Sequence, residues 1–188
     1  VWMSPPFPET IVDETPTTNI VMNAEGLLAE VPKDGHDTIP HFIRPTVITP
    51  HDWEEVKRER FRRDDPHRKV AVSELKRLHP GHRDYPLGVD CGSMIGKIRD
   101  MLTFEGLAHA CYDYPDLGED MVETCCLLVE DFLEQVLDSF DFDFAAGWED
   151  ICYNSGPIVS VQFFRDVVVP RYKRIHNRLK KAGVDIWY

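Results

Sequence analysis

The clearest pattern of apolar and polar positions in this chain begins at Pro115. From Leu117 to Phe140, apolar side chains recur at steps of three and four residues, and Glu and Asp fill the opposite face. This spacing gathers the apolar side chains along one side of a helix. The pattern therefore predicts a long amphipathic helix that starts at Pro115 and buries one face.

Two shorter helices are predicted before residue 80. Thr49 is followed by Pro50, a combination typical of a helix N-terminus, and a narrow apolar stripe in a charged background continues to Phe61. We expect this helix to end near Asp64. A second short helix is expected over residues 66–78, before a Pro-Gly break.

Three short apolar runs in the second half of the chain are typical of buried strands. They are Leu87–Cys91, Phe142–Gly147 and Val184–Tyr188. A helical pattern up to about Tyr112 and the helix from Pro115 separate the first two runs. Between the last two runs, Ser160 is placed to cap a helix that Pro170 kinks and that ends at Gly183.

This order of strand, helix, strand, helix and strand predicts parallel strands joined by right-handed crossovers. A complete (β/α)8 TIM barrel takes about 250 residues, and this chain has 188. The Pro- and Thr-rich start carries β-type runs at 10–12, 19–22 and 27–31. The predicted fold class is α/β: a β-hairpin arm over residues 1–48 and a partial TIM barrel over residues 49–188, in one domain.

Both ends of the chain indicate a fragment. The chain starts at Val1 without the basic and apolar regions of a signal peptide, and it stops on the apolar run Ile186-Trp187-Tyr188. No helix follows to cover this last strand. Because an uncovered strand edge tends to pair with another chain, we expect a homo-oligomer.

The charge balance argues against two classes of partner. Lys and Arg total 21 against 33 Asp and Glu, which gives a formal net charge of −12. Such a field repels phosphate backbones and anionic lipid surfaces. No apolar run approaches the roughly 20 residues that span a bilayer. We therefore expect neither nucleic acid nor membrane as a partner.

The cysteines predict a reducing environment. Their number, five, is odd, and their spacing matches neither C-x-x-C nor a zinc finger. A fully paired disulfide framework is therefore excluded, and a cytoplasmic location fits best.

The first candidate site is the loop after the first predicted strand, because ligands collect at the carboxyl ends of parallel strands. We accordingly expect a small-molecule substrate. In this loop Gly92 permits close backbone approach and Ser93 can cap the next helix, whose first turns carry Arg99 and Asp100. The alternative is a capping loop with a solvent-facing ion pair.

The second candidate site, Trp148-Glu149-Asp150, follows the second predicted strand. Two adjacent carboxylates beside an indole can act as acid or base, bind a cation or hold polar groups of a substrate. Alternatively, one carboxylate caps the loop and the other is solvated. We favour a site because a core avoids a charged pair at this position. Tyr153 and Asn154, in the next loop, are expected to line the same pocket.

The remaining candidates carry weaker signals. Asp185 interrupts the apolar run of the last strand. Cys91 and Cys152 both follow strands and could share a metal or thiol site, although buried, inert cysteine is the more common situation. Cys125 and Cys126 lie in the long helix and are expected to pack in the core. The eight histidines form no metal-binding pattern, and no phosphate-binding Gly-rich loop is present.

Several strings in the second half of the chain occur in a specific order. They are Trp148-Glu149-Asp150-Ile151-Cys152-Tyr153-Asn154-Ser155-Gly156-Pro157-Ile158-Val159-Ser160, Phe164, Pro170-Arg171-Tyr172-Lys173-Arg174-Ile175 and Lys181-Ala182-Gly183-Val184. They resemble the uroporphyrinogen decarboxylase superfamily, which includes haem-pathway decarboxylases and corrinoid-linked methyltransferases. The resemblance extends back through Cys91-Gly92-Ser93, Phe104-Glu105-Gly106-Leu107 and Tyr114-Pro115-Asp116-Leu117.

This resemblance implies an (α/β)8 barrel with a ligand cleft at its C-terminal mouth. The family's arginine-rich segment and early-strand Asp would precede Val1, and its late His, or the His-x-Cys zinc motif of the methyltransferases, would follow Tyr188. The resemblance therefore implies no cofactor within this chain. Zinc or a corrinoid is implied only for a full-length protein.

The resemblance favours one branch of the superfamily. Asp100, with Arg99 beside it, stands where decarboxylases place a Tyr, and the Trp148-Glu149-Asp150 string looks more like the methyltransferase-like branch. We therefore expect a methyltransferase-like protein acting on a methylated or corrinoid-linked substrate. The alternatives are uroporphyrinogen decarboxylase, acting in tetrapyrrole biosynthesis, and a fragment without catalysis, so enzymatic activity is left open.

The expected roles of the site residues follow from these interpretations. The residues expected to be catalytic are Glu149, Asp150 and Asp100. The residues expected to bind substrate are Arg99, Trp148, Tyr153, Asn154 and Ser93.

Overall fold

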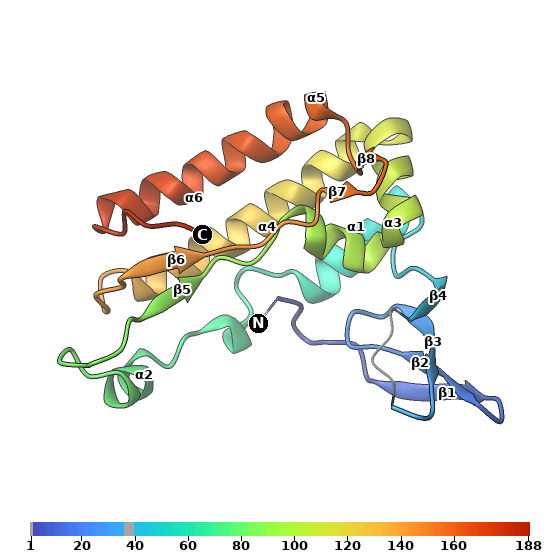
Figure 1. The fold of residues 1–188 in the computed structure, drawn as a ribbon, viewed down its shortest axis with the longest axis horizontal. Coiled ribbons are helices and arrows are strands. Elements are labelled where there is room, and N and C mark those ends of the chain that lie inside the picture. Colours follow the sequence, from blue (N-terminus) through green and yellow to red (C-terminus); the bar gives the residue numbers. More distant parts are fainter. Residues whose placement is uncertain (1, 36–39) are drawn as a thin grey trace.

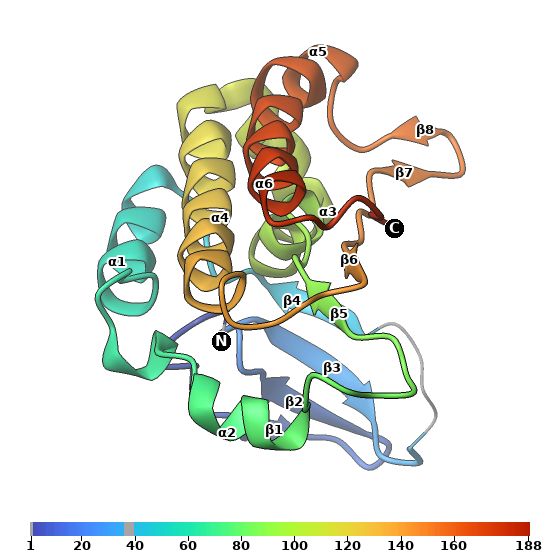
Figure 2. The ribbon, with the colours of Figure 1, turned by 90° about the vertical axis from the view of Figure 1, so that its left-hand side faces the viewer.

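The computed structural model describes residues 2–35 and 40–188. An antiparallel sheet lies at one end of the molecule, and long helices lie over a short parallel pair of strands at the other (Figure 1). Turned by a quarter, the view shows helices α1, α4, α6 and α3 standing together above the sheet (Figure 2). The helices span Pro50–Arg60, Pro115–Val136, Val169–Lys181 and Ile95–Asp113, respectively.

The N-terminal sheet has four strands, all antiparallel, in the order of the chain. They are β1 (Thr10–Glu14), β2 (Thr18–Met22), β3 (Leu28–Pro32) and β4 (His41–Arg44). The first three coincide with the β-type runs of the sequence. The expected hairpin arm is thus extended by β4, which the sequence analysis did not predict because this strand is exposed along its whole length and has no buried alternation.

The helix predicted after Thr49 is confirmed as α1. Thr49 Oγ1 accepts a hydrogen bond from Asp52 N at 3.3 Å, and Asp52 Oδ2 accepts one from Thr49 N at 2.7 Å, so both ends of a capping box are formed. The expected helix over residues 66–78 is divided into a 3-10 turn, Pro66–Arg68, and α2, Val72–Leu78. The division arises because Lys69 is extended, with φ −69° and ψ 126°.

Helix α4 supplies the centre of the core, as its apolar periodicity predicts. Met121, Cys125 and Leu133 on its inner face are fully buried. Helices α3 and α6 both pack against α4. Helix α3 is interrupted at Thr103, whose φ of 64° is the one left-handed value among the described non-glycine residues.

The segment after Ser160 begins as expected. The Ser160 hydroxyl accepts from Phe163 N at 3.0 Å and caps the short helix α5, Val161–Phe163. A π-helical turn over Phe164–Val168, labelled η2, precedes Pro170 and leads into α6. Helix α6 ends before Gly183, which has φ +83° and gives the left-handed residue that a helix C-terminus favours.

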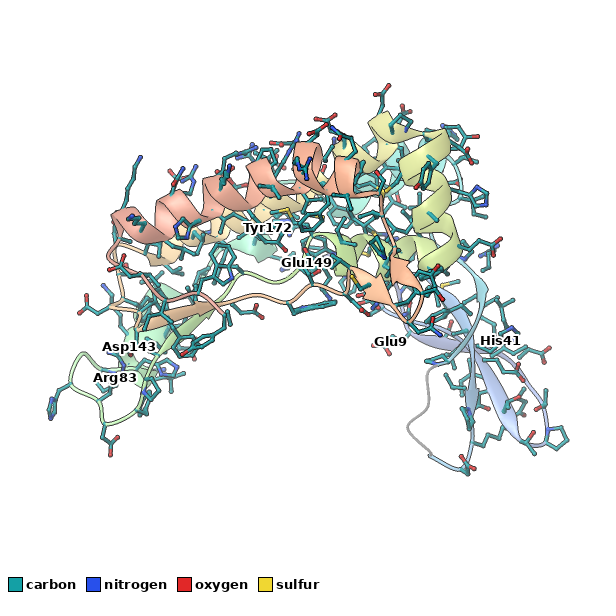
Figure 3. The ribbon with its side chains drawn as sticks, turned by 45° about the horizontal axis from the view of Figure 1, so that its top comes forward. Glu9, His41, Arg83, Asp143, Glu149 and Tyr172 are labelled. Atoms are coloured by element: carbon teal, nitrogen blue, oxygen red, sulfur yellow. The ribbon has the colours of Figure 1, made fainter. Side chains whose placement is uncertain are left out.

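The parallel strands are short. β5 (Gly88–Asp90) and β6 (Phe144–Ala146) pair in parallel, and a single parallel bridge joins Ala145 to Trp187. At the amino ends, Asp143 Oδ2 accepts from Arg83 Nη2 at 2.6 Å and from Leu87 N at 2.7 Å, which fixes the entry of both strands (Figure 3).

The expected partial (β/α)8 TIM barrel is wrong. Parallel pairing among the described residues is limited to three residues of β5 and β6 and the one bridge to Trp187, and the largest sheet is antiparallel. Helices α3, α4 and α6 bury their apolar faces largely against one another, as a layer, so no ring of helices surrounds a parallel array. No helix of the described part is long and apolar enough to cross a membrane.

Candidate functional site

The first two candidate loops lie side by side. Cys91 N donates to Ala146 O at 2.7 Å, and Trp148 N donates to Gly92 O at 3.0 Å, so the parallel pairing continues past both strand ends. The third segment joins them, because Gly147 N donates to Tyr188 O at 3.0 Å. The loops after β5 and β6 and the C-terminal segment therefore meet at one edge of the molecule.

Glu149 is the acceptor at the centre of this edge. Its Oε1 accepts from Met94 N at 2.8 Å, and its Oε2 accepts from Ser93 Oγ at 2.9 Å and Gly96 N at 3.2 Å. Ile95 N lies within 3.2 Å of both oxygens. The backbone donors lie at the N-terminus of α3, where N–H groups have no partner within the helix. Glu149 thus caps a helix that is distant from it in sequence.

Tyr172 holds the same carboxylate from the opposite side. Figure 3 shows Tyr172 on α6 directed at Glu149 on the loop after β6. The Tyr172 hydroxyl donates a short hydrogen bond to Glu149 Oε1 and accepts one from Met94 N at 3.3 Å. Burial, together with the negative charge of Glu149, raises the pKa of Tyr172 well above its usual value. The phenol therefore remains a proton-bearing donor at neutral pH.

The remaining charged candidates form an ion-pair network beside the capped helix. Arg99 makes a short contact with Asp150 and lies 3.3 Å from Asp100. Lys97 Nζ is 3.6 Å from the other oxygen of Asp100. The Asp150 side chain is 52% exposed. The geometry of Asp150, Asp100 and Arg99 is that of a partly solvated network, and their expected catalytic and binding roles stay predictions.

A pocket of about 480 Å³ opens next to Glu149. Its walls are mainly aromatic and include Trp148, Tyr172, Trp187 and Tyr188. Tyr172 and Trp187 meet edge to face, with ring centroids 5.8 Å apart. Lys173 and His176, on exposed positions of α6, complete the lining with Gly147, Glu149 and Val169.

Two backbone positions allow this pocket to form. Gly96 lies directly under the Trp148 ring, and any Cβ at this position would overlap the indole. A Cβ at Gly147 would lie 3.1 Å from Trp187 Nε1 and 3.2 Å from Gly92 O. The absence of side chains at Gly96 and Gly147 therefore permits the close approach of both tryptophans to the strand ends.

Tyr153 and Asn154 lie apart from this pocket. They belong to a small hairpin of β7 (Cys152–Tyr153) and β8 (Gly156–Pro157). The Tyr153 ring packs edge to face on Phe104 of α3 at 5.1 Å, and Asn154 Oδ1 accepts from the neighbouring Ser155 hydroxyl. The expected gathering of all second-loop residues around one pocket is therefore met by Trp148 and Glu149 but not by these two residues.

The remaining candidates from the sequence are the cysteines and Asp185. Burial, with the nearby Asp90 charge, raises the pKa of Cys91 to about 12, so its thiol stays protonated, whereas Cys152 is exposed. No group of three His, Cys, Asp or Glu side chains suited to a metal ion occurs within residues 2–35 and 40–188. Zinc, which the family resemblance implies for a longer protein, finds no ligand set there. Asp185 is exposed.

The sequence analysis did not assign Tyr172, His176, Trp187 or Tyr188 to a site. Tyr172 and His176 are four residues apart and so share a helix face, and Trp187 and Tyr188 end the third predicted strand. These two signals together could have indicated an aromatic pocket. The partnership of Glu149 with Ser93 and Tyr172 had no local signal, because the three residues are separated along the chain by more than 20 positions.

Comparison of the chain with protein-family models, with curated proteins and with solved structures gives no match.

Proposed function

We propose that this chain binds a small methylated molecule in the aromatic pocket and takes part in transfer of its methyl group, as a methyltransferase-like member of the uroporphyrinogen decarboxylase superfamily. The observation that carries the proposal is the pairing of Glu149 with Tyr172 inside a mainly aromatic pocket. The resemblance of residues 148–160 to that superfamily supports the same proposal.

The pairing favours methyl transfer over proton-dependent chemistry. Both oxygens of Glu149 accept hydrogen bonds from the first turn of α3, and the raised pKa of Tyr172 keeps its proton in place. In methyl transfer, the bond from carbon to the acceptor forms while the bond to the donor heteroatom breaks, and that heteroatom keeps the electron pair. No proton moves in this step, so it needs no free acid or base.

Decarboxylation makes a different demand on the site. Loss of carbon dioxide leaves a carbanion equivalent that must be protonated, and a positioned side chain usually supplies that proton. Glu149 and Tyr172 are bound to each other and to backbone N–H groups, and two further proton-carrying groups of the lining, Lys173 and His176, lie on exposed positions of α6. In this proposal, Glu149 is a positioning residue that fixes the start of α3 under Trp148.

The pocket also fits the size and polarity of such a substrate. Its volume of about 480 Å³ lies within the range of roughly 300–1,000 Å³ typical of small-molecule sites. The faces of Trp148 and Trp187 offer favourable contacts to methyl groups, above all when these groups are attached to a positively charged nitrogen or sulfur. These features support a compact methylated substrate.

The proposal is tested by binding of a methylated probe. Tetramethylammonium is titrated into the protein, and the fluorescence of the pocket tryptophans is followed. We expect saturable binding that Trp187→Leu weakens by about 10-fold, the order of effect of losing one aromatic face. Tyr153→Leu is the matched control, since it removes an exposed aromatic ring outside the pocket, and it should leave the affinity unchanged.

A second titration with uroporphyrin distinguishes the decarboxylase alternative. Binding of uroporphyrin that Trp187→Leu weakens, without binding of tetramethylammonium, would overturn the methyl-transfer proposal in favour of tetrapyrrole chemistry. Equal weakening by Trp187→Leu and Tyr153→Leu would overturn the assignment of the pocket itself.

A further inference from the structure

A second cavity, of about 390 Å³, lies beside the carboxyl end of β5 and is distinct from the aromatic pocket. Four parts of the chain line it: the N-terminal segment at Trp2, the stretch after α1 from Arg63 to Val70, the β5 end with Lys97, and α4 between Leu128 and Gln135. Its lining shares no residue with that of the aromatic pocket.

The charge of this cavity is opposite to that of the chain. Arg63, Arg68, Lys69 and Lys97 line it, together with His67, against two acidic residues, Asp90 and Asp131. The whole chain has a formal net charge of −12, so the excess of positive side chains in this lining is opposite in sign to the net charge of the chain. A concave positive surface within a negative protein concentrates small anions from solution.

Internal partners already occupy the two acidic residues. Arg63 binds Asp131 through two parallel hydrogen bonds of 2.7 and 2.5 Å, and Asp90 Oδ1 accepts from Gly92 N at 2.7 Å. Lys69 is exposed and makes no ion pair with a carboxylate of the described residues. Lys97 Nζ lies 3.6 Å from Asp100, so Lys69 provides most of the charge that is left to meet a ligand.

Two rigid groups complete the cavity wall. Arg68 is held in place by donating to the carbonyl oxygens of Arg62, Arg60 and Trp2, at 2.7, 2.8 and 3.2 Å. The indole Nε1 of Trp2 is buried, and no hydrogen-bond acceptor reaches it among the described residues. A buried N–H without an acceptor is uncommon in folded proteins. This N–H donor and the cationic side chains would all bind an acceptor that carries negative charge.

We infer that this cavity binds the oxyanion group, phosphate or carboxylate, of a small molecule. Lys69 and Lys97 contact the anion as flexible point charges, the fixed Arg68 contributes to the positive field, and Trp2 Nε1 donates to one oxygen. Charge-assisted hydrogen bonds of this kind are about twice as strong as neutral ones. The inference does not depend on the methyl-transfer proposal, because the two cavities have separate linings.

The test is calorimetric titration of the protein with inorganic phosphate and, separately, with succinate. Ionic strength is matched throughout, because salt screens the attraction between the anion and the exposed lysines. We expect saturable binding of at least one of the two anions. The anion that binds with the higher affinity identifies the preferred group, phosphate or carboxylate. The double variant Lys69→Gln, Lys97→Gln should weaken binding by about 10-fold or more.

The matched control is the double variant Lys76→Gln, Lys180→Gln, which removes the same charge from exposed positions of α2 and α6. It should keep the wild-type affinity. Trp2→Phe retains the ring contact with Phe61 but lacks the N–H, and should weaken binding about 5-fold. Absence of binding for both anions, or equal weakening by the two lysine pairs, would overturn the inference.

Discussion

Replacement of Glu149 by glutamine keeps the length of the side chain but removes its charge and turns one acceptor oxygen into an N–H donor. Either orientation of the amide faces donors. On one side lie Met94 N and the Tyr172 hydroxyl, and on the other lie Ser93 Oγ and Gly96 N. The variant therefore loses at least one good hydrogen bond and opposes one donor with another.

The size of the effect follows from these contacts. A hydrogen bond to a charged acceptor contributes about 1.5–3 kcal/mol, and a negative charge at a helix N-terminus adds about 0.3–1 kcal/mol. Ser93 can rotate its hydroxyl toward the new amide, which recovers part of the loss. We expect Glu149→Gln to lower the free energy of unfolding by about 3 kcal/mol. In a chain of this length, that change lowers the melting temperature by roughly 6–12 °C.

Urea unfolding followed by circular dichroism measures this change directly. The midpoint should fall while the slope with urea stays constant, because the folded state remains equally compact. Asp150→Asn is the matched control, since it removes a neighbouring charge from a half-exposed ion pair with Arg99 and should cost no more than about 1 kcal/mol. Equal effects of the two variants, or a loss below about 0.5 kcal/mol for Glu149→Gln, would refute the capping role.

Three further predictions concern other residues. Because the pKa of Tyr172 is raised in the folded state, its contribution to stability is complete below about pH 10, the value for an unfolded chain, and falls as the pH rises above it. Urea unfolding at several alkaline pH values should show this loss of stability, and Tyr172→Phe should reduce it. A loss of stability with pH that is equally steep in the variant and in the wild type would contradict the assignment. Cys152 is the exposed thiol, so Ellman's reagent should react quickly with about one thiol per chain, and Cys152→Ser should abolish the fast phase. A fast phase that survives in the variant would show that another thiol is accessible. Thr103 has φ 64° and ψ 176°, a region that is almost exclusive to glycine, so Thr103→Gly should stabilise the protein by about 1 kcal/mol in urea unfolding, whereas destabilisation would contradict the strain.

Local features were predictable because the signal and its consequence lie within a few residues. Thr49 and Asp52 form the predicted helix start, Gly183 ends α6 in the left-handed region, and the apolar spacing from Pro115 places α4 within four residues of its expected end. In each case neighbouring residues decide the backbone geometry. Prediction from sequence is therefore strongest for features that are set by interactions between residues close together in the chain.

The barrel and much of the candidate site depend on contacts that the sequence does not specify. Alternation of strands and helices is compatible with a closed array and equally with a pair of short parallel strands under a helical layer. The packing of α3 and α6 against α4 decides between these arrangements. Likewise, Glu149 could be recognised as a carboxylate after a strand, but its partners Ser93 and Tyr172 come from remote segments.

The carboxylate of Glu149 also ties together the opening motions of three separate segments. The amide protons of Met94, Ile95 and Gly96 are bonded to a side chain of the loop after β6, which Tyr172 holds in turn from α6. Fraying of the first turn of α3 therefore requires the release of that loop or of that phenol. In hydrogen exchange, these amides should behave as one cooperative unit with β6 and α6, although a helix's first turn is ordinarily among its fastest-exchanging parts.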